Sequence, residues 1–426
     1  MPEKDKKIIN GWIFYDWANS VYPLVITTAI FPIFYEAVTT SKGINGELSD
    51  VVTFFGNSVI NTALYTYIIA LSFLIVSVIS PLLSGVADYI GNKKRFLQFF
   101  CYLGASACAS LYFFDTSYLE FSMFLVMMTS IGFWGSLVFY NAYLPEIAPA
   151  TEHDRISAKG YAFGYIGSSI LLIGLLVAIQ VFDMPAKWSF VITGLWWAGF
   201  AQITYARLPK VIKTDSHAKG KLLKGFLELK KVLSQLKDLS SLKKYLRAFF
   251  VYSMGVQTVM LMATLFGKKE IIDMPDSGLI ISVLLIQFVA VGGAYLFSWV
   301  SKKIGNINAL IIAVVMWVFI CIAAYFIYTA IGFYVLAGVV GLVMGGIQSL
   351  SRSTYSKLIP EGSKDTASFF SFYDVTEKIG IVIGMFAYGA IEAITGSMRN
   401  SVIGLITFFV LGLILLLYVP RKKLLI

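Results

Sequence analysis

Polar and ionisable side chains occur inside stretches that are otherwise apolar. Asp16, Asn19 and Ser20 share one face of a helix, because positions i, i+3 and i+4 lie on the same side. A charge at the centre of a bilayer costs about 2.5–3.5 kcal/mol, so this face must contact other helices or water. The residue types favour ion pairing, proton binding and solute binding at an inner gate. The full candidate set is Tyr15, Asp16, Asn19, Tyr140, Asn141, Gln348, Arg352, Tyr373, Asp374, Glu377 and Lys378.

Two pairings are expected within this set. Arg352 is expected to pair with Asp16 or Glu377 when the inner gate is closed, and Asp374 and Lys378, at i and i+4, are expected to neutralise each other. Asp16 and Glu377 are the candidates for carrying a coupled proton. The alternative is a structural ion-pair network that only holds the helices together.

Other kinds of chemistry find little support. The three cysteines lie singly in apolar stretches and the two histidines lie in charged loops, so neither a metal site nor a catalytic histidine is expected. The sequence contains no phosphate-binding loop, no nucleophile elbow and no zinc signature. We therefore expect no enzyme, no cofactor and no metal.

Composition places the chain in a membrane. It has 426 residues, 58% of them apolar and 14% charged, whereas soluble domains carry about 25% charged residues. Twelve stretches are long enough to cross about 30 Å of hydrocarbon as helices. They lie near 11–35, 62–87, 94–114, 118–142, 156–182, 186–207, 246–266, 277–300, 308–329, 332–356, 367–395 and 400–419. The predicted fold is an all-α membrane protein of two six-helix bundles.

The basic residues predict the orientation. Lys and Arg lie almost entirely in the segments on one side, with exceptions at Lys42, Lys187, Lys268, Lys269, Lys378 and Arg399. Because cytoplasmic segments are rich in Lys and Arg, both termini are predicted to be cytoplasmic, with an uncleaved first span in a bacterial inner (plasma) membrane. The net charge of +10 thus reflects topology, and no nucleic acid partner is expected.

The chain divides into two halves around a charged segment. The predicted division is a first bundle at 1–207, a cytoplasmic linker at 208–245 and a second bundle at 246–426. Leucines and a phenylalanine recur at helical spacing between lysines in the linker, which favours an interfacial helix on anionic lipid; a calmodulin-like partner site is the alternative.

Two other expectations are that Pro23 and Pro32 kink the first helix, and that Trp196 and Trp197 face lipid.

The halves repeat weakly. Ile90-Gly91-Asn92 recurs as Ile304-Gly305-Asn306, Leu144-Pro145-Glu146 as Ile359-Pro360-Glu361, and Ile166-Gly167 as Ile379-Gly380. The three matches keep nearly one offset, close to half the chain length. A duplicated six-helix unit is typical of transporters in which one bundle rocks against the other.

The segment Ser84-Gly85-Val86-Ala87-Asp88-Tyr89-Ile90-Gly91-Asn92-Lys93-Lys94-Arg95 resembles the loop 2–3 motif of the major facilitator superfamily. Small residues at 84 and 85 allow close helix approach, and Gly91 permits a tight turn. The resemblance implies a conformational latch formed by Gly85, Asp88, Gly91, Lys93 and Lys94, in which Asp88 accepts hydrogen bonds from the start of helix 11. Ser84 and Tyr89 depart from the usual Gly and Arg.

Four further motifs resemble the Atg22-like, or UMF1, family of that superfamily. They are Tyr15-Asp16-Trp17-Ala18-Asn19-Ser20, the segment from Tyr140 to Pro149, the segment from Arg155 to Gly167, and Gly345-Gly346-Ile347-Gln348-Ser349-Leu350-Ser351-Arg352-Ser353. The resemblance implies a secondary transporter, and its fungal vacuolar members are linked to amino acid export. It also implies that helices 1, 4, 10 and 11 line a central cavity.

The expected function is therefore alternating-access transport of a small solute such as an amino acid, coupled to protons, by a monomer in contact with membrane lipid. Two alternatives stay open. One is an exporter of amphiphiles or lysolipids, since helix 1 beyond Ser20 is mostly apolar. The other is a sensor or scaffold with the same fold that transports nothing.

Overall fold

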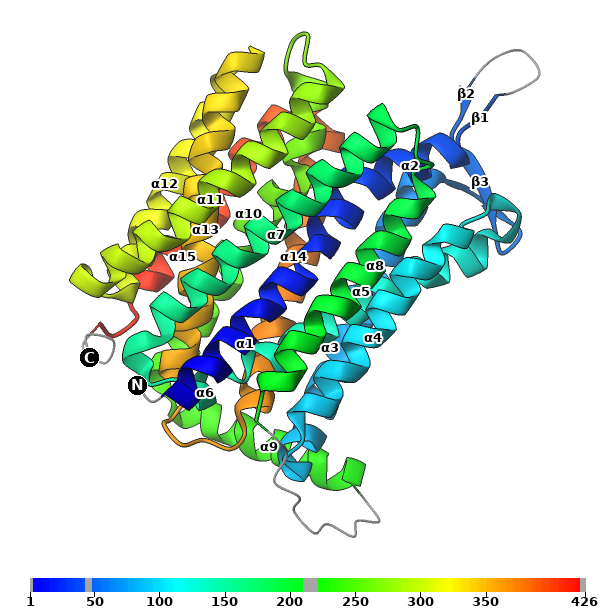
Figure 1. Ribbon diagram of the computed structural model, residues 1–426. Coiled ribbons are helices and arrows are strands. Elements are labelled where there is room, and N and C mark those ends of the chain that lie inside the picture. The colour runs from blue at the N-terminus through cyan, green and yellow to red at the C-terminus, as the bar shows by residue number, and fades with distance from the viewer. Residues whose placement is uncertain (1–2, 43–47, 210–220, 422–426) are drawn as a thin grey trace.

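The computed structural model describes residues 3–42, 48–209 and 221–421. Long helices run side by side and almost the whole described chain is helical (Figure 1). The first half contains α1 (Glu3–Asn19), η1 (Tyr22–Ile30), α2 (Phe31–Thr39), α3 (Asn61–Ile90), α4 (Lys93–Ser110), η2 (Leu111–Phe113), η3 (Thr116–Tyr118), α5 (Leu119–Asn141), α6 (Leu144–Ile147), η4 (Ala150–Glu152), α7 (His153–Val181) and α8 (Lys187–Arg207).

The remaining helices and two small hairpins complete the chain. The helices are α9 (Lys221–Asp238), α10 (Ser240–Glu270), α11 (Asp276–Ile304), α12 (Asn306–Phe326), α13 (Ala330–Leu358), α14 (Thr366–Thr395) and α15 (Met398–Leu417). The antiparallel hairpins pair β1 (Ser41–Lys42) with β2 (Leu48–Ser49), and β3 (Val51–Phe54) with β4 (Asn57–Ile60).

Eleven segments within the described residues are long and apolar enough to cross a membrane. The prediction of a polytopic all-α fold is confirmed, whereas α8, which covers the sixth predicted crossing, is not among the eleven. The expectation that Trp197 faces lipid was wrong, and Trp196 is only partly buried. Trp197 is completely buried, and Trp196 donates an indole N–H to the carbonyl of Trp17 at 3.2 Å. Indole N–H groups seek acceptors, and α1 provides one beside α8.

The first crossing changes its helical geometry partway. Residues Asp5–Thr39 form one long apolar segment, but Tyr22–Ile30 within it is π-helical, with Pro23 at its start. Proline has no N–H to donate, so the ordinary backbone pattern is interrupted there. The hydroxyl of Thr28 donates to the carbonyl of Pro23 at 2.8 Å. The sequence analysis predicts a kink at Pro23, and the structure has a π-helical segment that begins one residue earlier, at Tyr22.

Helices from the two halves of the sequence pack against each other. Within the first half, α1 lies on α7 and α8, and α4 lies on α5 and α8; within the second, α10 lies on α14 and α15, and α11 on α13. Between the halves, α3 contacts α14, and α7 contacts α11 and α13. A Cβ at Gly345 of α13 would overlap the carbonyl of Ala290, so this glycine permits the close α11–α13 contact.

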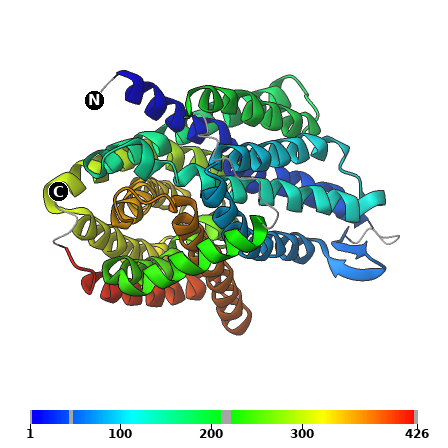
Figure 2. The ribbon, with the colours of Figure 1, turned by 90° about the horizontal axis from the view of Figure 1, so that it is seen from below.

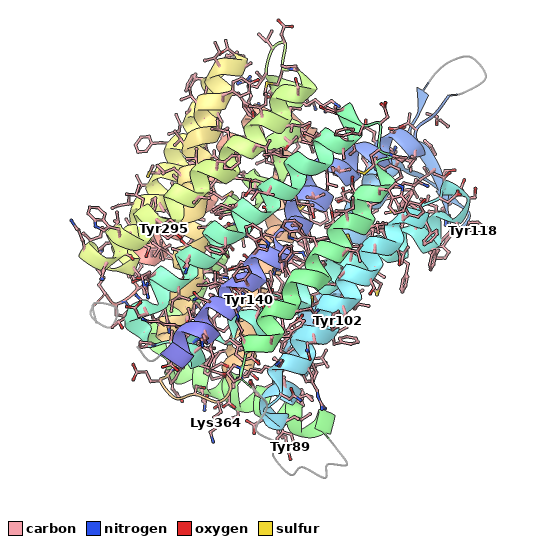
Figure 3. All side chains as sticks on the ribbon, viewed as in Figure 1. Tyr89, Tyr102, Tyr118, Tyr140, Tyr295 and Lys364 are labelled. Carbon is pink, nitrogen blue, oxygen red and sulfur yellow. The ribbon has the colours of Figure 1, made fainter. Side chains whose placement is uncertain are left out.

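One end of the molecule collects α6, α9 and both ends of the chain; we call it the α9 end (Figure 1). Figure 2, a view from this end, shows α9 in green lying across the ends of the long helices. In Figure 3, Tyr89 and Lys364 lie at this end, and Tyr118 lies at the opposite end beside the hairpins.

The helix α9 packs on α3, α10 and α14. Its Leu229 and Val232 are buried, whereas Phe226 and Leu233 are about half exposed. The predicted amphipathic helix is therefore present and buries part of its apolar face against protein. Residues 210–220 of the predicted linker lie outside the described residues, as do residues 422–426. The division into two bundles and a linker remains a prediction.

Candidate substrate site and interface contacts

A buried ion pair joins the two halves of the sequence. Asp16 of α1 and Arg352 of α13 are 5% and 2% exposed, and their carboxylate and guanidinium groups lie 3.0 Å apart. Asp16 and Glu377 were the two partners predicted for Arg352, and in the structure the partner is Asp16. Removing one member of such a pair leaves an uncompensated buried charge, so each side chain holds the other in place.

The surroundings of this pair satisfy both groups. The hydroxyl of Tyr140 donates to Asp16 Oδ2 at 2.7 Å, and Arg352 donates to the side-chain and backbone oxygens of Ser157, both at 2.9 Å. The guanidinium carbon lies 4.2 Å from the centre of the Tyr161 ring. A Cβ at Gly160 would overlap Asp16 Oδ2, so glycine makes room for the carboxylate. The sequence analysis did not include Ser157 and Gly160 among the candidates, although both lie in the quoted motif from Arg155 to Gly167.

A second charged cluster lies on α14. Lys378 is completely buried and contacts Asp374 at 3.1 Å and Glu377 at 2.8 Å. Its ammonium nitrogen lies 3.6 Å from the centre of the Trp134 ring, which comes from α5 in the first half. Glu377 also accepts a hydrogen bond from Gln257 at 2.8 Å. The predicted pairing of Asp374 with Lys378 is present, and Glu377 shares the same lysine.

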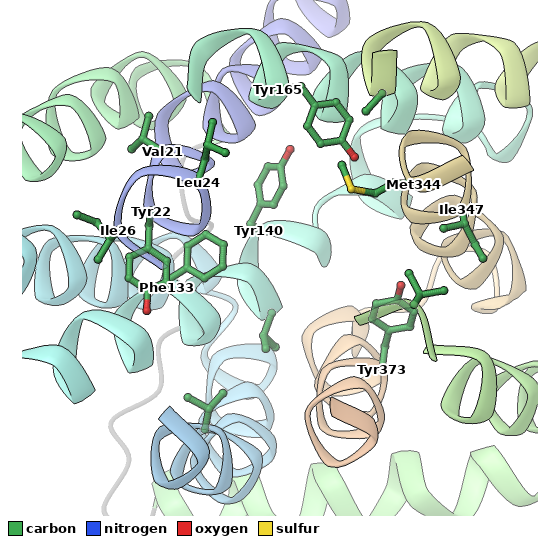
Figure 4. Packing of buried hydrophobic residues seen from close by; sticks show 14 of the residues in the cluster. Val21, Tyr22, Leu24, Ile26, Phe133, Tyr140, Tyr165, Met344, Ile347 and Tyr373 are labelled. Carbon is green, nitrogen blue, oxygen red and sulfur yellow. The ribbon is translucent and has the colours of Figure 1, made fainter. Parts of the chain in front are cut away.

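The remaining candidates contribute rings and amides around these clusters. Tyr373 stacks on Phe249 with ring centres 4.2 Å apart, and Gln348 accepts a hydrogen bond from Tyr165 at 2.5 Å. In Figure 4, the side chains of Tyr140, Tyr165 and Tyr373 come from different helices and point into the interior between them.

Three candidates have a buried polar atom but no direct role in either cluster. The hydroxyl of Tyr15, the amide nitrogen of Asn19 and the amide oxygen of Asn141 have no hydrogen-bond partner within the described part of the chain. Tyr15 instead packs its ring against Tyr140 at 4.9 Å. The charged candidates thus form two clusters, and of these two only the cluster around Asp16 and Arg352 joins the halves through an ion pair.

The predicted latch residues connect α3 to α14 at the α9 end. Asp88 accepts hydrogen bonds from the backbone N–H groups of Ala367 at 3.2 Å and Ser368 at 2.7 Å, in the first turn of α14. A helix N-terminus has unpaired N–H groups and a positive dipole end, which favour a carboxylate. Lys93 lies 3.3 Å from Asp88 and also contacts Glu146. We call Asp88, Lys93, Glu146 and the first turn of α14 the Asp88 latch.

The glycines of the motif act as the sequence suggested. Gly91 ends α3 with φ = 70°, a left-handed conformation that favours glycine. Gly85 allows a close helix approach, and the neighbour is α9: a Cβ at Gly85 would overlap the carbonyl oxygen of Gly225. Lys94 follows Lys93 in the first turn of α4.

A second contact at the same end was missed by the sequence analysis. Asp154 near the start of α7 accepts hydrogen bonds from Ser301 at 2.9 Å, Asn306 at 2.7 Å and Lys357 at 2.6 Å. We call these four residues the Asp154 cluster. The recurrence of Ile90-Gly91-Asn92 as Ile304-Gly305-Asn306 is the sequence signal that could have identified this position.

Comparisons with known proteins agree with this architecture. Residues 4–424 match the family described as "Vacuole effluxer Atg22 like". The chain is 31% identical to "Uncharacterized MFS-type transporter YxiO" of Bacillus subtilis (strain 168) over 99% of this chain and 97% of that protein. It is 25% identical to "Autophagy-related protein 22" of Coccidioides immitis (strain RS), over 93% of this chain and 83% of the relative.

Solved transporters share the fold. The human organic anion transporter MFSD10 (TETRAN) superposes with a TM-score of 0.71 at 12% identity, covering 98% of this chain and 100% of that one. The E. coli fucose:proton symporter FucP gives a TM-score of 0.68 at 15% identity, covering 98% of each chain. Because its sequence matches over almost its whole length and its described residues contain eleven long apolar helical segments, the chain belongs to the Atg22-like family and is a transporter of the major facilitator superfamily type.

Proposed function

We propose that this transporter moves a small solute by alternating access, with the Asp16–Arg352 pair as its inner gate. The observation that carries the proposal is that this pair is buried and joins α1 to α13, which belong to opposite halves of the sequence. Rocking of one half against the other would separate the two charges. Since a buried pair is poor evidence for stability alone, a switching role accounts better for its presence.

The α9 end is proposed to be cytoplasmic and closed in this structure. Its Lys and Arg residues support a cytoplasmic location. The Asp88 latch and the Asp154 cluster both bridge the halves at this end. The similarity to FucP in the outward conformation, with a TM-score of 0.68, supports the same state. Opening toward the cytoplasm would require both contacts to break.

Proton coupling is proposed to act through Glu377. The side chain of Asp16 is 7% exposed and bonded to both Arg352 and Tyr140, whereas the side chain of Glu377 is 16% exposed. Its charged neighbours are Lys378 and Asp374 on its own helix. A proton carrier must meet water from alternate sides, and Glu377 is the more accessible of the two carboxylates.

Export of amino acids is the proposed transport activity. The family description as a vacuole effluxer and the similarity to autophagy-related proteins of fungi support export. Amino acids are the solute class that the resemblance to the fungal vacuolar members implies. The chain is proposed to work as a monomer in a bacterial inner membrane, in contact with lipid.

The test is transport in proteoliposomes. Purified protein reconstituted with an imposed pH gradient is expected to accumulate or release a radiolabelled amino acid in proportion to the gradient. Glu377→Gln is expected to abolish the response to pH and to retain exchange of solute against solute. Glu392→Gln is the matched control, because Glu392 pairs with Lys269 outside both clusters. Unchanged pH dependence in Glu377→Gln would exclude Glu377 as the proton carrier, and transport of lysolipids alone would favour the amphiphile exporter.

A further inference from the structure

A small recess lies between the two charged clusters. Its lining combines tyrosines and a phenylalanine with two glutamines, and Glu377 is the single charged member of that lining, all of it within the described chain. The lining residues are Tyr161, Phe249, Tyr252, Ser253, Val256, Gln257, Ile347, Gln348, Ser351, Tyr373 and Glu377. The recess therefore presents a carboxylate and no basic side chain.

The basic side chains near the recess are already occupied. Arg352 is 2% exposed and donates to Asp16 and Ser157, and Lys378 is completely buried between two carboxylates. Neither group is left to bind an anionic part of a solute. On α14, Asp374, Glu377 and Lys378 together carry one more negative charge than positive charge.

An unbalanced charge inside a membrane protein is unfavourable, so a bound cation would be stabilised there. The aromatic rings strengthen this preference, because ring faces attract cations. The recess has a volume of about 20 Å³. That volume holds one water-sized group, which is also the size of an ammonium group.

We propose that the solute carries a protonated amine, and that this amine binds in the recess against the Glu377 carboxylate. The inference rests on the proposed transport function and narrows its substrate class to organic amines. The rest of the solute lies outside the recess. A carboxylate on the solute is not required, since no free basic group among the described residues of the lining would bind it.

Binding to the purified full-length protein in detergent tests the proposal without transport. The probes are phenethylamine, phenylpropanoate and phenylethanol, which share a ring and a two-carbon spacer and differ in charge. Calorimetry is expected to show phenethylamine binding at least about tenfold more tightly than the other two, as expected for one desolvated charge pair. Phenylalanine, which adds a carboxylate to the amine, is expected to bind no more tightly than phenethylamine.

Variants assign the preference to Glu377. Glu377→Gln is expected to remove the preference for the amine, Glu377→Asp to retain part of it, and Glu392→Gln to leave it unchanged. Equal binding of all probes, including no binding by any of them, overturns the proposal, as does an unaltered preference in Glu377→Gln. If Glu377→Gln does not fold, the proposal is decided by the affinity of the unaltered protein for phenethylamine relative to its affinities for phenylpropanoate and phenylethanol. Amine binding without transport in proteoliposomes would instead refute the proposed transport function.

Discussion

Two contacts at the α9 end join the halves of the molecule, and they are built differently. In the Asp88 latch, the carboxylate belongs to the end of α3 and accepts from two backbone N–H groups and one hydroxyl, that of Ser368, in α14. In the Asp154 cluster, the carboxylate belongs to α7 and accepts from side chains of α11, α12 and α13. By the offset of the repeat, Asp154 corresponds to Ser368 and Asp88 to Lys302. Both carboxylates belong to the first half, but they occupy different positions of the predicted repeat: Asp88 lies at the end of a helix, and Asp154 lies at the start of one.

The two contacts as a whole lie at corresponding positions of the predicted repeat but use different hydrogen-bond donors. A carboxylate bonded to backbone N–H groups depends little on the partner's side chains. A carboxylate bonded only to side chains depends on each of them. Substitutions should therefore affect the two contacts unequally.

The largest effect is expected for Asp154→Ala. It leaves the ammonium group of Lys357, which is mostly buried, without its carboxylate, and removing one partner of a buried pair costs about 3–5 kcal/mol. The free energy of unfolding in detergent measures this loss. The double variant Asp154→Leu with Lys357→Met is expected to recover most of it, because apolar residues replace such pairs at little cost. A double variant as unstable as the single one would contradict this account.

A smaller loss is expected for Asp88→Ala, about 1–3 kcal/mol, because two backbone N–H groups lose an acceptor while Lys93 keeps Glu146. The same unfolding measurement applies. Asp88→Asn, which keeps one acceptor oxygen, is expected to lose less. If Asp88→Ala is as damaging as Asp154→Ala, the proposed inequality of the two contacts is wrong.

The contact of α9 with α3 offers a third comparison. Gly85→Leu is expected to destabilise the protein by about 1–3 kcal/mol, because the added side chain meets the backbone of Gly225. Gly174→Leu on α7 is the control, since a Cβ there has no neighbour within 4 Å. Limited proteolysis at α9 is expected to accelerate in the first variant only.

The smallest effect is expected at Lys231, whose ammonium group lies 2.9 Å from Asp365 just before α14. The hydrogen bond to Asp365 raises the pKa of Lys231 above its ordinary value. The pair therefore contributes below the ordinary lysine pKa and loses its contribution as pH rises through the raised value. Because Lys231 is about half exposed, Lys231→Gln is expected to cost at most about 1 kcal/mol, less in high salt. Melting temperatures measured across salt concentrations and up to strongly alkaline pH check this expectation.

The sequence by itself determined the membrane class, eleven of the twelve predicted crossings and the contact of Asp88 with the start of α14. These properties follow from local composition and from short motifs: hydrocarbon requires long apolar helices, and Asp88 with Gly91 forms a turn whose geometry is local. It also limited Arg352 to two partners, because a buried charge in a membrane needs an opposite one.

Only the tertiary structure decided which partner Arg352 takes, that Glu377 shares Lys378 with Asp374, and that Asp154 joins three helices from the other half. The tertiary structure also decided that the helix packed against Gly85 is α9, which is not a crossing, and that Trp197 is buried. Each of these contacts joins segments distant in sequence or depends on how a helix is rotated about its axis. Apolar periodicity does not specify that rotation when a helix is apolar on every side.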